Sequence, residues 1–326
     1  MNLTGSDRIF QIHPTRRCNL RCLHCYSDSS PDATDELPAE LATRLVADAA
    51  ALGYTVASVS GGEPFLYGAL PEVLGAAKTA GMRTQVVSNG LALTAARLDA
   101  VQPVLDLLAV SIDGPPADHD RMRGLSGSFR RLDQRLSLVR ERGIPFGLLF
   151  TLTMWNVHEL EWAVDYAMAC GARLLQVHPL EASGRAVALA DDVPDETEAA
   201  MALLEGLRLQ ARVGQQLAIH VDVALASQLL DVIGGRRDDR PSHLSDVISP
   251  LVVEPDGICV PLEYGFPRHY ALGDTRDHSL AQLAERWLDD VWPSFRTGLG
   301  RMRDDLRSRD SQVVVNPYAT LRNTTG

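Results

Sequence analysis

Three of the five cysteines in this chain lie within one short stretch, Cys18-Asn19-Leu20-Arg21-Cys22-Leu23-His24-Cys25-Tyr26. The apolar run at residues 9–12 precedes it and predicts a strand, so the cysteines are expected on a loop at that strand's carboxyl end. A [4Fe–4S] cluster normally takes four thiolates. Three thiolates in C-x3-C-x2-C spacing therefore leave one iron open to bind a substrate or cofactor.

Zinc is the alternative ligand for this loop. A closed structural zinc site needs four ligands in tetrahedral geometry. His24 is available as a fourth donor, but it lies between two of the cysteines, where it reaches the same ion only awkwardly. Disulfides are not expected for an odd, clustered set of cysteines without a secretion signal.

A repeating strand–helix pattern follows the cysteine loop. Strands are predicted at 9–12, 56–60, 84–88, 107–112, 146–152 and 174–177, and helices at 38–52, 70–80, 94–101, 128–142 and 157–170. This alternation predicts parallel strands joined by right-handed crossovers, hence an α/β barrel or part of one. The working loops of such folds lie at the carboxyl ends of the strands. Besides the cysteine loop, that rim is expected to carry Gly61-Gly62-Glu63-Pro64, Asn89, Ser111, Asp113 and His178.

The cysteine loop resembles the C-x3-C-x-aromatic-C signature of the radical S-adenosylmethionine (SAM) superfamily, with His24 in the aromatic position. Gly61-Gly62-Glu63-Pro64 resembles the glycine-rich motif of that family. The resemblance continues in the right order through residues 1–190. It implies a partial (β/α)6 TIM-like barrel, one [4Fe–4S] cluster on Cys18, Cys22 and Cys25, and SAM as cofactor.

The resemblance also implies which residues bind SAM. Glu63 and the nearby backbone would hold the methionyl amino group, and Ser111 and Arg123 would contact the ribose and carboxylate. The full implied set is Tyr26, Gly61, Gly62, Glu63, Asn89, Ser111, Arg123 and Leu180, with Leu180 against adenine. Alternatives are a surface charge at Arg123, a turn cap at Asn89 and a structural rim histidine at His178.

The segment from Pro255 to Leu262 and the predicted helix 280–287 resemble a SPASM-type C-terminal extension, an α+β unit. Leu262 stands where that extension normally has a cysteine. Only Cys170 and Cys259 remain outside the N-terminal loop, so we predict one cluster per chain. Cys259 is a candidate to quench a substrate radical; the alternative is a buried structural thiol.

Three segments are predicted along the chain: a radical SAM partial barrel over 1–190, a connecting segment over 191–240, and a SPASM-like extension with a tail over 241–326. The connecting segment should contain a helix at 194–213 and a strand at 217–221. A charged loop at 234–241 is the predicted boundary. The last forty residues resist assignment.

The 326 residues carry a net charge of -11, which argues against nucleic acid or an anionic membrane as the main partner. Residues 1–8 lack the apolar core of a signal peptide, so a reducing cytoplasm is expected. Similarity to the peptide-maturase branch makes a ribosomal peptide the leading substrate. A small metabolite is the alternative, and a non-catalytic iron–sulfur or zinc protein is the third hypothesis. Expected partners are an electron donor such as flavodoxin or ferredoxin and a separate leader-peptide-binding protein.

Overall fold

A curved ten-stranded sheet forms the centre of the molecule in the computed structural model, which describes residues 7–234, 240–308 and 314–325. Its strands are β1 (Ile9–Ile12), β2 (Val56–Val59), β3 (Arg83–Ser88), β4 (Leu107–Ile112), β5 (Phe146–Leu152), β6 (Leu174–Pro179), β7 (Ala218–Val221), β9 (Leu251–Val253), β10 (Ile258–Pro261) and β11 (Gly273–Asp274). They lie in the order β11-β10-β9-β1-β2-β3-β4-β5-β6-β7. All neighbours from β9 through β7 pair in parallel.

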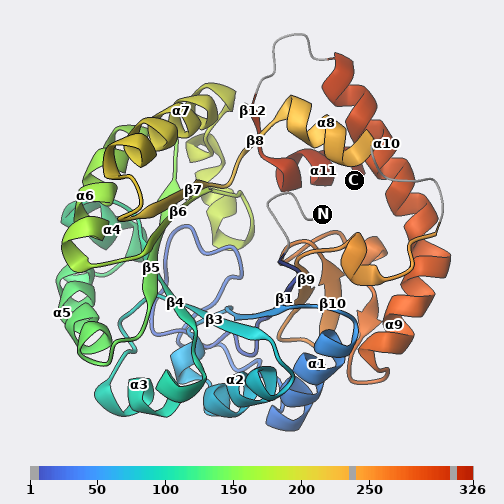
Figure 1. The fold of residues 1–326 in the computed structure, drawn as a ribbon, viewed down its shortest axis with the longest axis horizontal. Coiled ribbons are helices and arrows are strands. Elements are labelled where there is room, and N and C mark those ends of the chain that lie inside the picture. The colour runs from blue at the N-terminus through green and yellow to red at the C-terminus, as the bar shows by residue number, and fades with distance from the viewer. Residues whose placement is uncertain (1–6, 235–239, 309–313, 326) are drawn as a thin grey trace.

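Helices cover the outer side of this sheet (Figure 1). They are α1 (Ala39–Ala51), α2 (Leu70–Thr79), α3 (Ala95–Val101), α4 (Pro116–Arg123), α5 (Ser128–Glu141), α6 (Leu160–Cys170) and α7 (Glu196–Val213). In α1 the predicted four-residue spacing holds, because Leu41, Leu45 and Ala49 are all buried. Successive side chains of a strand alternate between the two faces of the sheet. On β4, Ile112 is fully buried while the neighbouring Ser111 is half-buried.

The predicted partial barrel is confirmed, but the sheet does not stop at six strands. β7 continues it beyond β6, and β9 continues it beyond β1. Residues 217–221 were expected to form a strand of the connecting segment; in the structure β7 is the edge strand of the sheet and is exposed or half-buried along its length. The partner of β1 comes from some 240 residues later in the chain, where no repeating pattern marks it.

The C-terminal region shares the sheet of the barrel. β9 and β10 form an antiparallel hairpin, and Gly273 and Asp274 form the short strand β11, which pairs with β10. The remaining elements are β8 (Ala224–Leu225), α8 (Ala226–Gly234), α9 (Leu280–Arg286), α10 (Trp292–Ser308), β12 (Val314–Val315) and α11 (Pro317–Thr325). Most of the predicted boundary loop at 234–241 lies outside the described residues.

None of the helices in the described part of the chain has the length and hydrophobicity that a bilayer-spanning helix requires.

Candidate functional site

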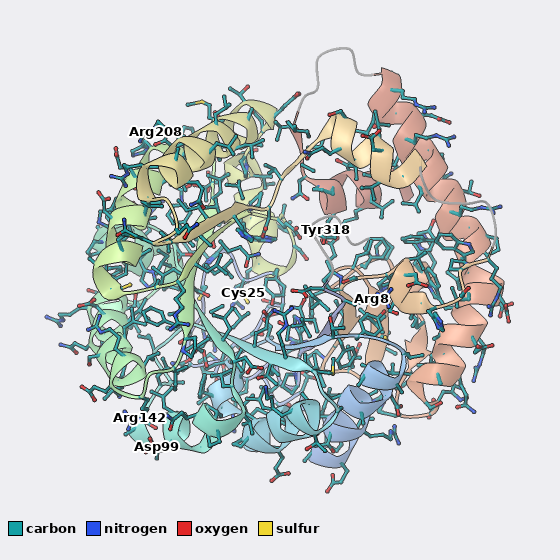
Figure 2. The ribbon with its side chains drawn as sticks, viewed as in Figure 1. Arg8, Cys25, Asp99, Arg142, Arg208 and Tyr318 are labelled. Carbon is teal, nitrogen blue, oxygen red and sulfur yellow. The ribbon has the colours of Figure 1, made fainter. Side chains whose placement is uncertain are left out.

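The cysteine loop connects β1 to α1 and lies inside the curve of the sheet, where Figure 2 labels Cys25. Cys18 and Cys22 are only 7% and 8% exposed, and Cys25 is half-buried. The loop is held by backbone hydrogen bonds, including Cys18 N to Ser30 O at 3.0 Å and Leu23 N to Met122 O at 2.9 Å. Three thiols from one loop are thus held close to the interior of the barrel.

Each of the three sulfurs has an N–H donor within reach. The Asn89 side-chain amide lies 3.6 Å from Cys18 Sγ, the Arg123 guanidinium lies 3.8 Å from Cys22 Sγ, and the Ser29 backbone N–H lies 3.3 Å from Cys25 Sγ. Burial raises the pKa of the Cys18 thiol to about 12 and also raises the pKa of Cys22. Buried thiolates at these positions therefore need a compensating cation.

This donor set fits a [4Fe–4S] cluster. Its ligands bind different irons and need not converge on one point, and hydrogen bonds to sulfur are among the groups that tune such clusters. Among residues 7–234, 240–308 and 314–325 there is no group of three or more His, Cys, Asp or Glu side chains placed to hold a metal ion.

The Gly61-Gly62-Glu63-Pro64 turn packs directly against the cysteine loop. Gly62 N donates to Thr15 O at 2.8 Å, and a Cβ on Gly62 would lie 2.3 Å from the carbonyl oxygen of Arg17. Only glycine fits there, because this approach is far inside van der Waals contact. Gly61 has φ of +107°, a conformation that also favours glycine.

Glu63 is fully buried, and its carboxylate accepts hydrogen bonds from protein groups. They come from Ser88 Oγ at 2.8 Å, Asn89 N at 2.9 Å and Phe65 N at 3.2 Å. Burial raises the pKa of Glu63, and these donors oppose that rise. The sequence predicts a ligand contact for this side chain; in the structure it ties the end of β2 to the end of β3.

Asn89 lies between the strand ends and the cysteine loop. Its side-chain Nδ2 donates to Asn19 Oδ1 at 2.8 Å in addition to its contact with Cys18, and its Oδ1 accepts from Leu91 N at 2.9 Å. Asn89 thus closes the turn after β3 and also reaches the first cysteine, while its contact with SAM stays a prediction.

A buried ion pair links β4 to α4. Arg123, 7% exposed, donates from Nε and Nη2 to the two oxygens of Asp113, at 2.6 and 3.0 Å. His24 Nε2 lies 3.1 Å from the same carboxylate. Burial alone would raise the pKa of Asp113, but Arg123 and His24 outweigh burial and hold it well below its usual value. Arg123 was predicted to reach SAM; here two of its nitrogens are paired with Asp113 and the third faces Cys22.

The other predicted SAM residues surround the interior of the barrel. Tyr26 Oη lies 3.2 Å from Ser60 Oγ, and burial raises its pKa to about 12. Ser111 occupies the half-buried face at the end of β4, and Leu180 is 3% exposed just after β6. Tyr26 lies in the loop after β1, Ser111 near the end of β4 and Leu180 just after β6, so all three lie on the carboxyl-terminal side of parallel strands.

Arg185 is a clamp residue that sequence reasoning missed. Its backbone N–H donates to Cys25 O and its Nε donates to Cys22 O, both at 3.0 Å. Beside it, a Cβ on Gly184 would lie 2.4 Å from Tyr26 O. The only sequence signal is its place in the loop after β6, one residue after a glycine.

The C-terminal region contributes side chains to the same interior. Tyr264 stacks on His13 with ring centroids 5.0 Å apart, and its ring is 5.5 Å from that of Tyr26. On α11, Arg322 pairs with Glu263 and with Glu181. The extension thus reaches the barrel through aromatic and ionic contacts.

Cys259 is not among these interior groups. It is 0% exposed on β10 and belongs to the main apolar core, while Cys18 and Cys22 form a separate small cluster with Leu20. Burial raises the pKa of the Cys259 thiol well above its usual value. The structural alternative given above accounts for this placement.

Residues 12–167 match the radical SAM superfamily. The chain is 35% identical to Fe-coproporphyrin III synthase of Methanosarcina barkeri over 153 residues, 46% of this chain and 38% of that protein. It is 38% identical to the PqqA peptide cyclase of Ruegeria pomeroyi over 169 residues, 50% of this chain and 44% of that protein. The chain therefore spans less than half the length of these curated relatives.

Among solved structures, Streptococcus suis SuiB bound to S-adenosylmethionine superposes with a TM-score of 0.69. The match covers 89% of this chain and 68% of SuiB at 14% sequence identity. This likeness extends beyond the superfamily match and includes the C-terminal region in the shared fold.

Proposed function

Because residues 12–167 of this chain form a radical SAM domain, we propose that the protein is a radical SAM enzyme that modifies a ribosomally made peptide. The observation that carries the proposal is the buried loop with three thiols, each facing an N–H donor, packed against the glycine turn. Cys18, Cys22 and Cys25 would hold one [4Fe–4S] cluster. When bound, the cluster and SAM supply reductive cleavage of SAM and a 5′-deoxyadenosyl radical that takes hydrogen from the substrate.

The residues of the chain would then bind and orient SAM and shield the reacting carbon from water. Gly61 and Gly62 would let the backbone come close to the methionyl end of SAM. Glu63 would hold Asn89 and the turn in place by accepting a hydrogen bond from Asn89 N. Asp113 orients Arg123 toward the second cysteine. Tyr26, Ser111 and Leu180 would line the nucleoside part of the site. Together with the bound cofactor they would help to keep water away from the reacting carbon.

A peptide substrate is supported by the name of the PqqA peptide cyclase and by the chain's net charge of -11, which suits a basic peptide segment. SuiB, similar in fold, has also been solved bound to the precursor peptide SuiA. A small metabolite is the second candidate, because Fe-coproporphyrin III synthase is 35% identical over 153 residues. A porphyrin-type substrate would change its absorbance on binding and a peptide would not, so titration with iron coproporphyrin separates the two.

We also propose the wider setting of the enzyme. A flavodoxin or ferredoxin would donate the electron, and a separate protein would present the leader peptide. Residues 1–190 would form the catalytic barrel, 191–240 the connection, and 241–326 the extension. A reducing compartment such as the cytoplasm would protect the cluster.

Anaerobic reconstitution followed by incubation with SAM and dithionite tests the activity. We expect 5′-deoxyadenosine, detected by chromatography, from the wild-type chain. Glu63→Ala and Arg123→Ala should lower SAM affinity while leaving measurable iron. If SAM affinity is unchanged in both, the family contacts have been assigned to the wrong residues.

A further inference from the structure

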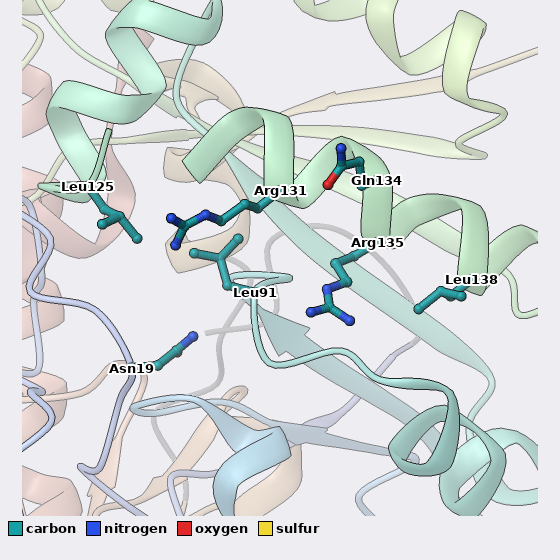
Figure 3. A pocket seen from close by; sticks show the side chains of 7 residues that line it. All are labelled: Asn19, Leu91, Leu125, Arg131, Gln134, Arg135 and Leu138. Atoms are coloured by element: carbon teal, nitrogen blue, oxygen red, sulfur yellow. The ribbon is translucent and has the colours of Figure 1, made fainter. Parts of the chain in front are cut away.

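A pocket of about 530 Å³ lies between the cysteine loop and α5. Arg131 and Arg135 on α5 form one wall, and Asn19, Leu91 and Leu125 form the opposite side (Figure 3). Its α5 wall belongs to the outer layer of helices (Figure 1), so the pocket lies between that layer and the cysteine loop.

The side of this pocket formed by Leu91 and Leu125 packs against the cysteine loop. Leu91 and Leu125 pack against the small cluster made of Cys18, Leu20 and Cys22. Asn19 is the residue next to Cys18, and its Oδ1 accepts a hydrogen bond from the Asn89 side-chain amide at 2.8 Å. The same amide lies 3.6 Å from Cys18 Sγ. Leu91 and Leu125 thus lie between the pocket and the buried cluster that contains Cys18 and Cys22.

The pocket is basic although the chain is acidic. Arg131 is exposed and Arg135 half-buried, and neither guanidinium has an ion pair or side-chain hydrogen bond with a residue in the described ranges. The whole chain has a net charge of -11. An acidic partner protein would be repelled by most of the surface of this acidic chain and attracted by the two arginines of the pocket. This difference would orient the partner as it approaches.

We propose that this pocket is the docking site of an acidic one-electron carrier protein that reduces the cluster. The inference rests on the proposed function, since it needs a cluster on Cys18, Cys22 and Cys25. In the step, the reduced carrier loses one electron and the [4Fe–4S] cluster gains it; no atom or proton is transferred. Electron transfer slows steeply with distance, so the thin wall at Leu91 and Leu125 is the short route.

The test uses the anaerobically reconstituted full chain and an acidic flavodoxin as the probe. Binding is measured by calorimetry with oxidised flavodoxin, and electron transfer by stopped-flow absorbance with the hydroquinone. The double variant R131E/R135E should weaken binding roughly tenfold or more and slow the transfer, with a smaller effect at high salt. Cleavage of SAM driven by dithionite should be unchanged, because a small reductant does not need the docking site.

Arg130 offers a matched control on the same helix. It is exposed and adjacent to Arg131 but does not line the pocket. R130E therefore makes the same change of charge as R131E, but at a position outside the pocket. R131E alone should weaken flavodoxin binding more than R130E does. Equal effects of the two single variants, or wild-type binding and transfer in R131E/R135E, would overturn the docking site. Absence of SAM cleavage with dithionite in the wild type would instead overturn the proposed function.

Discussion

At the residue scale, Glu63 joins two strand ends through three accepted hydrogen bonds and has no exposed surface. Glu63→Ala should leave Ser88 and the Asn89 amide without a buried acceptor, which costs about 1–3 kcal/mol for such a group. We therefore expect a lower free energy of unfolding in urea as well as weaker SAM binding by calorimetry. A variant with normal stability that has lost SAM affinity would instead make Glu63 a direct ligand contact.

The ion pair of Asp113 and Arg123 should be costly to break. Asp113→Asn leaves a guanidinium buried without its counter-charge, and removing one partner of a buried pair costs about 3–5 kcal/mol. Urea unfolding of the cluster-free chain measures this directly. Lys78→Met breaks an exposed pair with Asp106 and should cost less than about 1 kcal/mol. Equal losses in the two variants would contradict the structural role assigned to Asp113.

His178 should give the fold a dependence on pH. Its side chain is 42% exposed, so partial burial lowers its pKa, but Asp222 at 3.0 Å and the nearby Glu181 and Glu263 outweigh burial and raise the pKa to about 9. Protonated His178 therefore stabilises the fold fully below its usual pKa of 6.5, and this contribution is lost as pH rises through about 9. His178→Gln should flatten the fall of Tm between pH 6.5 and 9. If Tm falls with pH as steeply in His178→Gln as in the wild type, groups other than His178 determine the pH dependence of stability.

These residues also mark the limit of sequence reasoning at this scale. The sequence identified Glu63 and Arg123 as important and placed Glu63 at a strand end on the same rim as the cysteine loop. It did not reveal that Glu63 bonds to Ser88 and Asn89, because that depends on which strand ends become neighbours, or that Arg123 pairs with Asp113, because helix α4 was not predicted. Arg185 carries no motif at all, and only the path of the loop after β6 brings it to Cys22.

At the element scale, the glycine turn and the cysteine loop fit together only without a side chain at Gly62. Its φ is not in the left-handed region, so an alanine is allowed by the backbone; the contact of 2.3 Å with Arg17 O is the obstacle. Gly62→Ala should displace the loop and lower the iron retained after reconstitution. Iron content by colorimetric assay measures this loss.

Gly75 provides the control for that substitution. It lies within α2, and a Cβ there would meet no atom within 4 Å. Gly75→Ala should keep the iron content and gain up to about 1 kcal/mol of stability from helix propensity. Normal iron content in Gly62→Ala would contradict the close packing of the turn on the loop.

The elements that the sequence predicted share strong local signals. Strands such as β4 and β5 are apolar runs, and helices such as α1 and α5 have regular apolar spacing and glycines after their ends. Helix α4 was missed because it is short and polar, with prolines at its start. The pairing of β9 with β1 could not be predicted, since nothing local links residues so distant in the chain.

At the scale of the whole molecule, the C-terminal region is a structural continuation of the barrel. It adds β9, β10 and β11 to the sheet and brings Tyr264 and Arg322 toward the interior. Its one cysteine, Cys259, is packed in the apolar core. We expect Cys259→Ala to lower stability by removing a buried side chain while leaving the product and its yield unchanged, measured by mass spectrometry once a substrate is found. A changed product would restore the quenching role.

The central claim, one radical SAM cluster on Cys18, Cys22 and Cys25, is tested most directly by measuring iron, sulfide and 5′-deoxyadenosine together. The reconstituted wild-type chain should hold about four irons and four sulfides and cleave SAM with dithionite. The triple variant Cys18→Ala, Cys22→Ala and Cys25→Ala should be colourless and inactive. A triple variant that keeps about four irons with a reducible cluster, or that still releases 5′-deoxyadenosine, would contradict the account.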